Sequence, residues 1–313
     1  PYNNCMSHEH PTPHADGPAP EPLKGLPTVT APSGRHIVQL FLIPGLIVAG
    51  AVSILLGFSW LAGGDRTPDQ LLKNIESANA DIRWRAANDL AQVLKRDDNL
   101  AADVSFGLRL VEKLARALDE LDRVEKSYAT SADDASSRAA AKKSLVAQRN
   151  YVQYLGACLG NLSVPVGAPL LADLAKNGRG GDESLRYLIR RQAVWALANL
   201  GEGQKRYHKL SDDQKADVRR TLEAEAVGSG DASRWATATL GWLDGKPTLG
   251  VIPALAECAK DPRDIFLREQ VAHALIFWDG TPEEQKLAEQ TLMVLSRDLG
   301  AGHDNRIELK DGD

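Results

Sequence analysis

The sequence has few of the residues that disulfide-rich proteins need. It contains only three cysteines, Cys5, Cys158 and Cys258, which are too few and too scattered for a disulfide framework. Cys158 and Cys258 lie within alanine- and leucine-rich patterns, so we interpret them as small core residues. A disulfide between these two is the alternative, and the redox compartment stays undetermined.

Aromatic residues and an excess of positive charge are also scarce. Aromatics make up 5% of the chain while alanine and leucine recur throughout, which favours closely packed helices over sheets. The formal net charge is -5, whereas a protein that binds a phosphate backbone needs a basic excess. The glycine-rich stretch near Gly178 lacks the lysine and spacing of a P-loop and reads as a turn. We therefore expect an all-α protein that does not bind nucleic acid.

Residues 1–35 contain almost no bulky apolar side chain and are rich in proline, histidine and glycine. This composition predicts a disordered tail. His8, Glu9, His10 and His14 have metal-binding side chains, but a disordered tail does not fix a coordination geometry. No metal site, and no other cofactor site, is predicted.

A long apolar run follows, and residues 36–63 are predicted to form one transmembrane helix. The stretch from Ile37 to Ala62 carries no charged side chain and exceeds the about 20 residues that span a bilayer. A cleaved signal peptide fits less well, because the preceding tail is long and Trp60 spoils a small-residue cleavage site. Basic residues on the two sides balance, so the positive-inside rule leaves the sidedness open, with a weak preference for an external main domain.

Residues 68–298 are helical in their periodicity and repeat internally, and a polar tail is expected over residues 299–313. Five amphipathic segments align on a small or apolar residue four positions before a leucine, which makes one buried stripe. The aligned pairs are Ala86 and Leu90, Leu155 and Leu159, Ala193 and Leu197, Ala236 and Leu240, and Val271 and Leu275. Most separations are near the about 40 residues of a helix-pair repeat, and the first is about twice that.

Intervening sequence supplies a partner helix for most of these segments. The expected partners are Asp69 to Ala78, Val166 to Ala175, Asp212 to Ala226 and Val251 to Lys260. The doubled first gap holds a heptad-like stretch and the polar loop ATSADDASS, which predicts one long hairpin that protrudes from the stack.

These segments resemble the second helix of HEAT repeats, in which an apolar residue and an arginine precede alanines and leucines. Arg83, Arg190 and Arg268 occupy the arginine position, whereas Val152 and Ser233 depart from the pattern. The resemblance covers about Pro68 to Arg297. It implies a right-handed α-α superhelix, a HEAT-like solenoid of the armadillo type, whose concave face holds a protein partner.

The three arginines are candidate partner-binding or repeat-ladder positions, although arginines of this kind usually pair with nearby acids, here for example Asp81 or Asp264. Five tryptophans on the repeat segments are expected to pack between repeats, with anchoring of a partner as the alternative. They are Trp84, Trp195, Trp235, Trp242 and Trp278. His273 is interpreted as structural, and no catalytic set of residues is apparent.

The functional expectation is a membrane-anchored protein–protein interaction scaffold and not an enzyme, single-pass in a bacterial cytoplasmic membrane. Its partners would be proteins of unknown identity and the lipid bilayer through residues 37–62. An accessory subunit of a larger membrane complex, packed laterally through Gly45, Gly50 and Gly57, is one alternative. A lyase-type enzyme on a HEAT-like fold is the second, and the sequence offers no spacing that demands it.

Overall fold

The computed structural model describes residues 34–62, 68–131, 135–262 and 264–301. Every regular element in these ranges is an α-helix, which confirms the all-α prediction. The chain divides into two units, residues 1–64 and 65–313. The predicted tails, residues 1–35 and 299–313, lie almost wholly outside the described ranges, and so does the centre of the polar loop, residues 132–134.

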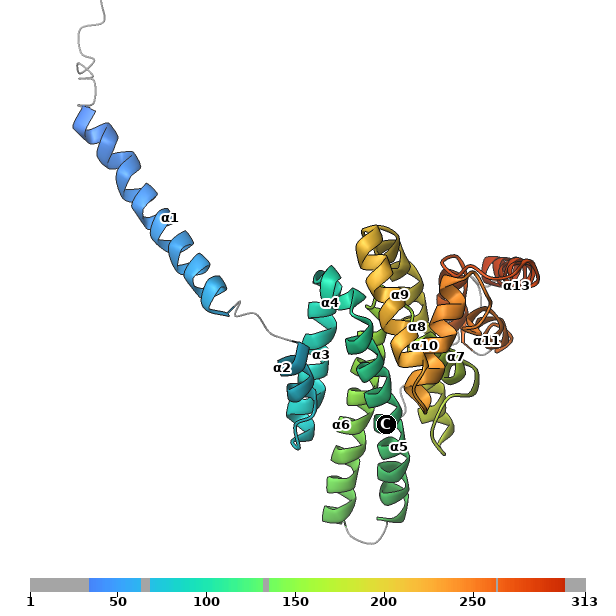
Figure 1. Ribbon diagram of the computed structural model, residues 1–313. Coiled ribbons are helices and arrows are strands. Elements are labelled where there is room, and N and C mark those ends of the chain that lie inside the picture. Colours follow the sequence, from blue (N-terminus) through green and yellow to red (C-terminus); the bar gives the residue numbers. More distant parts are fainter. Residues whose placement is uncertain (1–33, 63–67, 132–134, 263, 302–313) are drawn as a thin grey trace, which may run out of the picture. The chain divides into compact units, whose positions relative to one another are not determined.

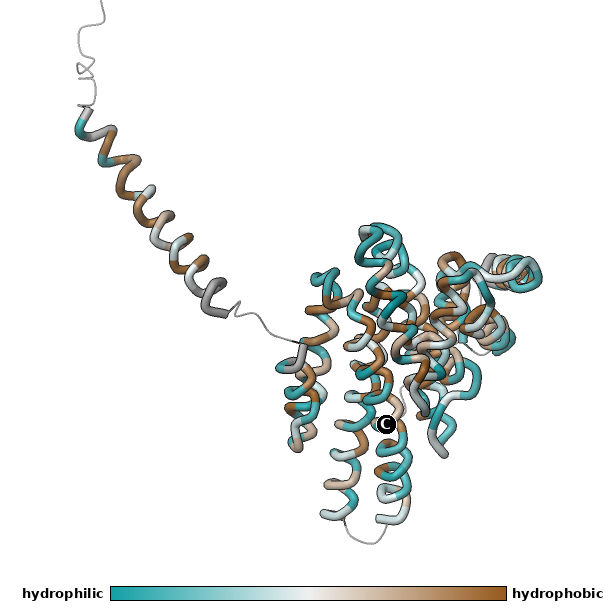
Figure 2. The backbone as a smooth tube through the Cα atoms, viewed as in Figure 1, coloured by the Kyte–Doolittle hydropathy of each residue, from teal (hydrophilic) through white to brown (hydrophobic). Residues whose placement is uncertain are grey.

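The first unit contains one long apolar helix, α1 (Gly34–Ala62) (Figure 1). Its segment Val38–Gly57 has 20 residues and a mean hydropathy of 2.4, and none of that segment is buried. At a rise of about 1.5 Å per residue this length matches a hydrocarbon core of about 30 Å. The helix is thus long and apolar enough to cross a membrane, and Figure 2 shows its run of hydrophobic residues.

The second unit is built from helices that pack in sequential pairs. The five segments aligned by sequence are the second helices of five such pairs, and the predicted partner helices begin and end within a few residues of their expected bounds. The helices are α2 (Pro68–Ile75), α3 (Ala80–Arg96), α4 (Asp98–Ala102), α5 (Val104–Thr130), α6 (Ala135–Gly160), α7 (Ala168–Asn177), α8 (Glu183–His208), α9 (Asp212–Ala226), α10 (Asp231–Leu243), α11 (Val251–Cys258), α12 (Ile265–Leu275) and α13 (Pro282–Ala301).

Local sequence signals explain where several of these helices begin. Asn79 accepts hydrogen bonds from the amides of Asp81 and Ile82 at the start of α3. Ser211 and Gln214 form a complete capping box at the start of α9. Each cap satisfies amides that have no partner within the helix. The capping residues in the sequence therefore indicate where these two helices begin.

Four second helices form one layer in which α3 packs on α6, α6 on α8, and α8 on α12. On the other side of this layer α7 packs on α11. We call the α3, α6, α8 and α12 layer the inner layer. Its buried stripe contains Leu90, Leu159 and Leu197, each 0% exposed, so the predicted inward face is confirmed for these helices.

The position of α10 differs from the expectation that all five aligned segments stack in sequence order. The α9 and α10 pair packs against α5, and α12 follows α8 directly in the inner layer. The physical reason lies in α5, which buries one stripe through Phe106 and Leu110 and a second side through Leu108 and Val111. A helix that is apolar on two sides needs a second cover, and the α9 and α10 pair supplies it.

In two of the aligned helices, α10 and α3, the buried residues differ slightly from the aligned positions. Leu240 and Leu243 of α10 are only partly buried, while Trp235 and Ala236 lie in the core. In α3 the fully buried alanine is Ala87, and the aligned Ala86 is partly buried.

Neighbouring helix pairs are also joined by buried side chains that donate to backbone carbonyls. The thiol of Cys158 donates to Ala87 at 3.3 Å, and that of Cys258 donates to Ala175 at 2.9 Å. The indole of Trp278 donates to the Leu197 carbonyl at 3.0 Å. Both cysteines are free and buried, which confirms their interpretation as core residues.

Leu197→Asp should unfold the second unit, because it places an unpaired carboxylate in a fully buried position between α8 and its neighbours. We expect a loss of about 4 kcal/mol or more in the free energy of unfolding, measured by denaturant titration of helicity. The matched control is Val227→Asp at a side chain that is 87% exposed, where the loss should stay within about 0.5 kcal/mol. Equal stability of the two variants would show that the inward face is misplaced.

Candidate binding surfaces

The three predicted arginines each contact a neighbouring helix or the turn beside it. Arg83 of α3 donates to the Gln148 side chain of α6 at 2.9 Å, and its guanidinium lies over the Tyr151 ring at 4.8 Å. Gln148 in turn donates to the Ala117 carbonyl of α5 at 2.8 Å. A chain of polar contacts therefore joins three helices across the core.

The other two arginines have different partners. Arg190 of α8 donates to the Ala175 carbonyl of α7 at 3.1 Å and lies 3.6 Å from the carboxylate of Asp261. Arg268 of α12 is 8% exposed and pairs with Asp298 of α13. The acids suggested from the sequence have other contacts, since Asp81 pairs with Lys143 and Asp264 accepts from Tyr187.

The tryptophans fall into two groups. Trp235 and Trp278 are each 5% exposed and pack in the core, as predicted, and Trp84 and Trp242 are partly buried against it. Trp195 differs, because 41% of it is exposed. It lies five residues after Arg190, about 140° round α8 from the side that contacts α7, and so it faces away from the neighbouring layer.

Three other aromatic side chains lie on the helices of the inner layer. Trp84 of α3 stacks on Tyr154 of α6 with ring centroids 5.8 Å apart. Arg191, one turn before Trp195 on α8, lies over the ring of Phe266 on α12 at 3.9 Å. We call the set Trp84, Tyr154, Trp195 and Phe266 the aromatic face. Trp84 and Tyr154 are partly buried, whereas Trp195 and Phe266 are exposed. Exposed aromatic side chains beside arginine are typical of sites that anchor a protein partner.

A groove of about 850 Å³ lies beside the far half of the long hairpin formed by α5 and α6. Its walls are the carboxyl-terminal part of α5, the amino-terminal part of α6, the turn after α7 and the first turns of α8. Apolar side chains line it at Leu145, Val146, Leu185 and Leu188.

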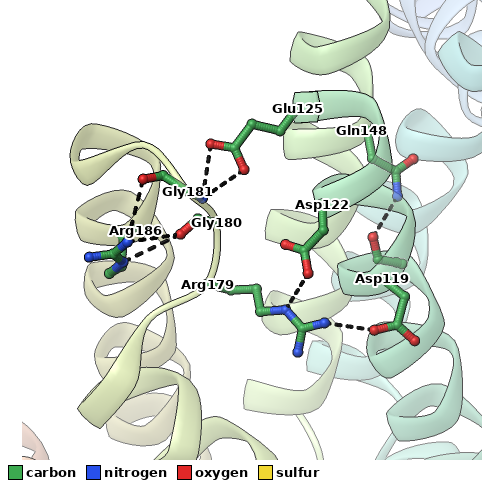
Figure 3. A network of polar contacts seen from close by, with 9 residues as sticks. Asp119, Asp122, Glu125, Gln148, Arg179, Gly180, Gly181 and Arg186 are labelled. Carbon is green, nitrogen blue, oxygen red and sulfur yellow. Dashed lines mark hydrogen bonds and ion pairs between the residues drawn. The ribbon is translucent and has the colours of Figure 1, made fainter. Parts of the chain in front are cut away.

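A polar network fixes the turn that closes one side of this groove (Figure 3). Arg179 donates to Asp122 at 2.8 Å and to Asp119 at 2.7 Å, both on α5. Glu125, one turn further along α5, accepts from the amides of Gly181 at 2.9 Å and Asp182 at 2.7 Å. The turn is thus held to α5 by three acidic side chains.

The charges in this network reinforce one another. Burial acts to lower the pKa of Arg179, but the hydrogen bond and charge of Asp122, together with Asp119, raise it overall. Gly180 has a φ of 107°, and a Cβ there would meet a Leu185 methyl group at 2.9 Å. Only glycine suits that conformation and that space, so the glycine-rich sequence is required for the turn to reach α5.

The sequence pattern did not reveal the groove. The glycine-rich turn was visible, but its partners on α5 lie 56 to 60 residues earlier in the chain. The i, i+3 spacing of Asp119, Asp122 and Glu125 on one helix face was the available signal, and an acidic stripe of that kind is common on solvated helices.

Within the described ranges no group of three or more His, Cys, Asp or Glu side chains is placed to hold a metal ion. The histidine-rich segment that includes His8, His10 and His14 lies outside those ranges. His273 packs edge-on against the Phe277 ring with centroids 5.0 Å apart. Comparison of the chain with protein-family models, curated proteins and solved structures gives no significant match.

Glu125→Ala should free the turn after α7, because two backbone amides lose their acceptor. We expect the amide hydrogens of Gly181 and Asp182 to exchange at least about ten-fold faster, as measured by NMR. Glu125→Gln keeps one acceptor oxygen and should give a smaller increase. The amide of Gln214, which donates to Ser211 at the start of α9, serves as the internal control. Unchanged exchange at Gly181 would contradict the role assigned to Glu125.

Tyr151→Phe should change the alkaline limit of stability. Burial raises the pKa of Tyr151 from 10.0 to about 12, against the opposing charge of Arg83. The folded state holds this phenolic proton more tightly than the unfolded state, so the contribution is complete below pH 10 and is lost as the pH rises from about 10 through about 12.

The variant loses the 2.8 Å hydrogen bond from Tyr151 to the Ile75 carbonyl, at a cost of about 1 kcal/mol at neutral pH. It should then lose less stability than the natural protein between pH 10 and 12, measured by urea titration at each pH. Tyr154→Phe, one turn along α6, is the matched control and should keep the steep alkaline loss. Parallel pH profiles for the natural protein and Tyr151→Phe would be the contrary result.

Proposed function

We propose that this chain is a membrane-anchored protein–protein interaction scaffold, with α1 as a single-pass anchor and the second unit as a HEAT-like solenoid. The inner layer would form the concave face of that solenoid. The observation that carries the proposal is the aromatic face, where Trp195 and Phe266 are 41% and 42% exposed. Large aromatic side chains beside cations supply contact area at low entropic cost, and they dominate the binding energy of many interfaces.

The anchoring part of the proposal rests on the 20-residue apolar segment of α1. All its described side chains are exposed, which in water would leave a long apolar surface uncovered. A bilayer would cover that surface without any partner helix. The glycines Gly45, Gly50 and Gly57 have open space around them, which also suits lateral packing against another membrane helix.

Trp195→Ser tests the scaffold proposal in the full-length chain. Native membranes are washed with alkaline carbonate to confirm that the protein remains embedded, and are then solubilised gently for quantitative co-purification. We expect the specific partner to be lost from the variant by more than about ten-fold, because a central tryptophan contributes about 2 kcal/mol or more to an interface.

Val227→Ser is the control for a surface change away from the aromatic face, at a position that is 87% exposed. Both variants should keep the natural helicity and melting temperature, because neither side chain is buried. Retention of every co-purifying protein by Trp195→Ser would argue against the aromatic face as the binding surface. Release of the natural protein by carbonate would argue against the anchor.

A further inference from the structure

The groove beside the long hairpin combines an apolar lining with three cations that form no ion pair within the described chain. Its carboxylates are already engaged: Asp122 accepts from Arg179, Glu125 accepts from two backbone amides, and Asp182 caps Leu185 at the start of α8. Three cations also line it, namely Lys126 of α5 and Lys142 and Arg149 of α6. In the part of the chain that the structure describes, these three side chains form no ion pair. The lining carries three carboxylates and three cations, but the carboxylates are held in contacts within the chain, so the three cations remain available to pair with acidic groups of a ligand.

The spacing of these cations distinguishes between classes of ligand. Lys142 and Arg149 are seven residues apart on α6, which is two helical turns or about 10.5 Å along the helix. A ligand with two anionic groups about two helical turns apart can pair with both side chains. A peptide segment meets the requirement, because it can carry acidic residues two turns apart with apolar residues between them.

One wall of the groove lies on the same helix as the exposed tryptophan. Leu188 lines the groove, and Trp195 lies seven residues later on α8, so both project from the same side of that helix. A segment that enters at the groove therefore has a continuous path along α8 to the exposed tryptophan.

We propose that the groove between the α5 and α6 hairpin and the start of α8 binds an acidic amphipathic segment of a protein partner. Its apolar residues contact Leu145, Val146 and Leu188, and its carboxylates pair with Lys126, Lys142 and Arg149. This inference rests on the proposed scaffold function and adds the chemistry of the segment that the scaffold recognises.

The experiment measures binding of a defined probe to the full-length protein in phosphatidylcholine nanodiscs. The probe is a fluorescein-labelled helical peptide of about four turns with a leucine face flanked by glutamates two turns apart. A second peptide carries lysine in place of each glutamate. Fluorescence anisotropy should show the acidic peptide binding at least about ten-fold more tightly, with the difference reduced in about 1 M salt.

Charge reversal at the groove supplies the decisive comparison. The double variant Lys142→Glu with Arg149→Glu should weaken binding of the acidic peptide by about ten-fold or more. Val146→Glu, at a side chain 38% exposed, should weaken it similarly by placing a charge on the apolar wall. Lys143→Glu changes the neighbouring lysine, which lies outside the groove and pairs with Asp81, and should leave binding within about two-fold.

Equal binding of the two peptides, or equal binding by the double variant and the Lys143 control, would overturn the proposal. Anionic phosphatidylglycerol vesicles that bind through Lys142 and Arg149 while the peptide does not would also overturn it, in favour of a lipid. The peptide assay needs no native partner, so its failure is separate from the loss or retention of partners in the Trp195→Ser experiment.

Discussion

The packing of one apolar stripe per helix against a neighbouring helix is the interaction on which the second unit depends. Each of α3, α6 and α8 buries leucine on the side that faces its neighbours, and Leu90, Leu159 and Leu197 are completely covered. The second helices pack on one another in the order α3, α6, α8 and α12, so each of these pairs buries its stripe against the next. Trp195 and Phe266 lie away from this stripe and are exposed.

Much of this arrangement could be predicted from the sequence. The period of alanine and leucine located the second helices, and the capping box of Ser211 and Gln214 marks the start of α9, a partner helix. The placement of α9 and α10 could not be predicted in the same way. A stripe such as Trp235 and Ala236 shows that a helix buries one side, but it does not show which neighbour covers it. That choice depended on α5 having two apolar sides.

The two candidate sites also differ in how far the sequence predicts them. Trp195 lies on a helix that the sequence located. Its exposure depends only on which side of α8 faces inward. The groove depends on contacts between residues 56 to 60 positions apart, which local pattern does not encode. Arg83, Arg190 and Arg268 hold equivalent sequence positions, yet they contact an amide side chain, a carbonyl and a carboxylate respectively. Arginines at equivalent sequence positions thus differ in the chemistry of their contacts.

The two buried thiols have a practical consequence. Cys158 bonds to α3 and Cys258 bonds to α7, so each sulfur lies at a different seam between helix pairs. Burial raises the pKa of both thiols, which keeps them protonated and slow to react while the seams stay closed. Alkylation of each cysteine under native conditions would therefore time the opening of its own seam, one at the α3 side of the layer and one beside α11. The alkylation rates of the two cysteines therefore report separately on how often α6 separates from α3 and how often α11 separates from α7.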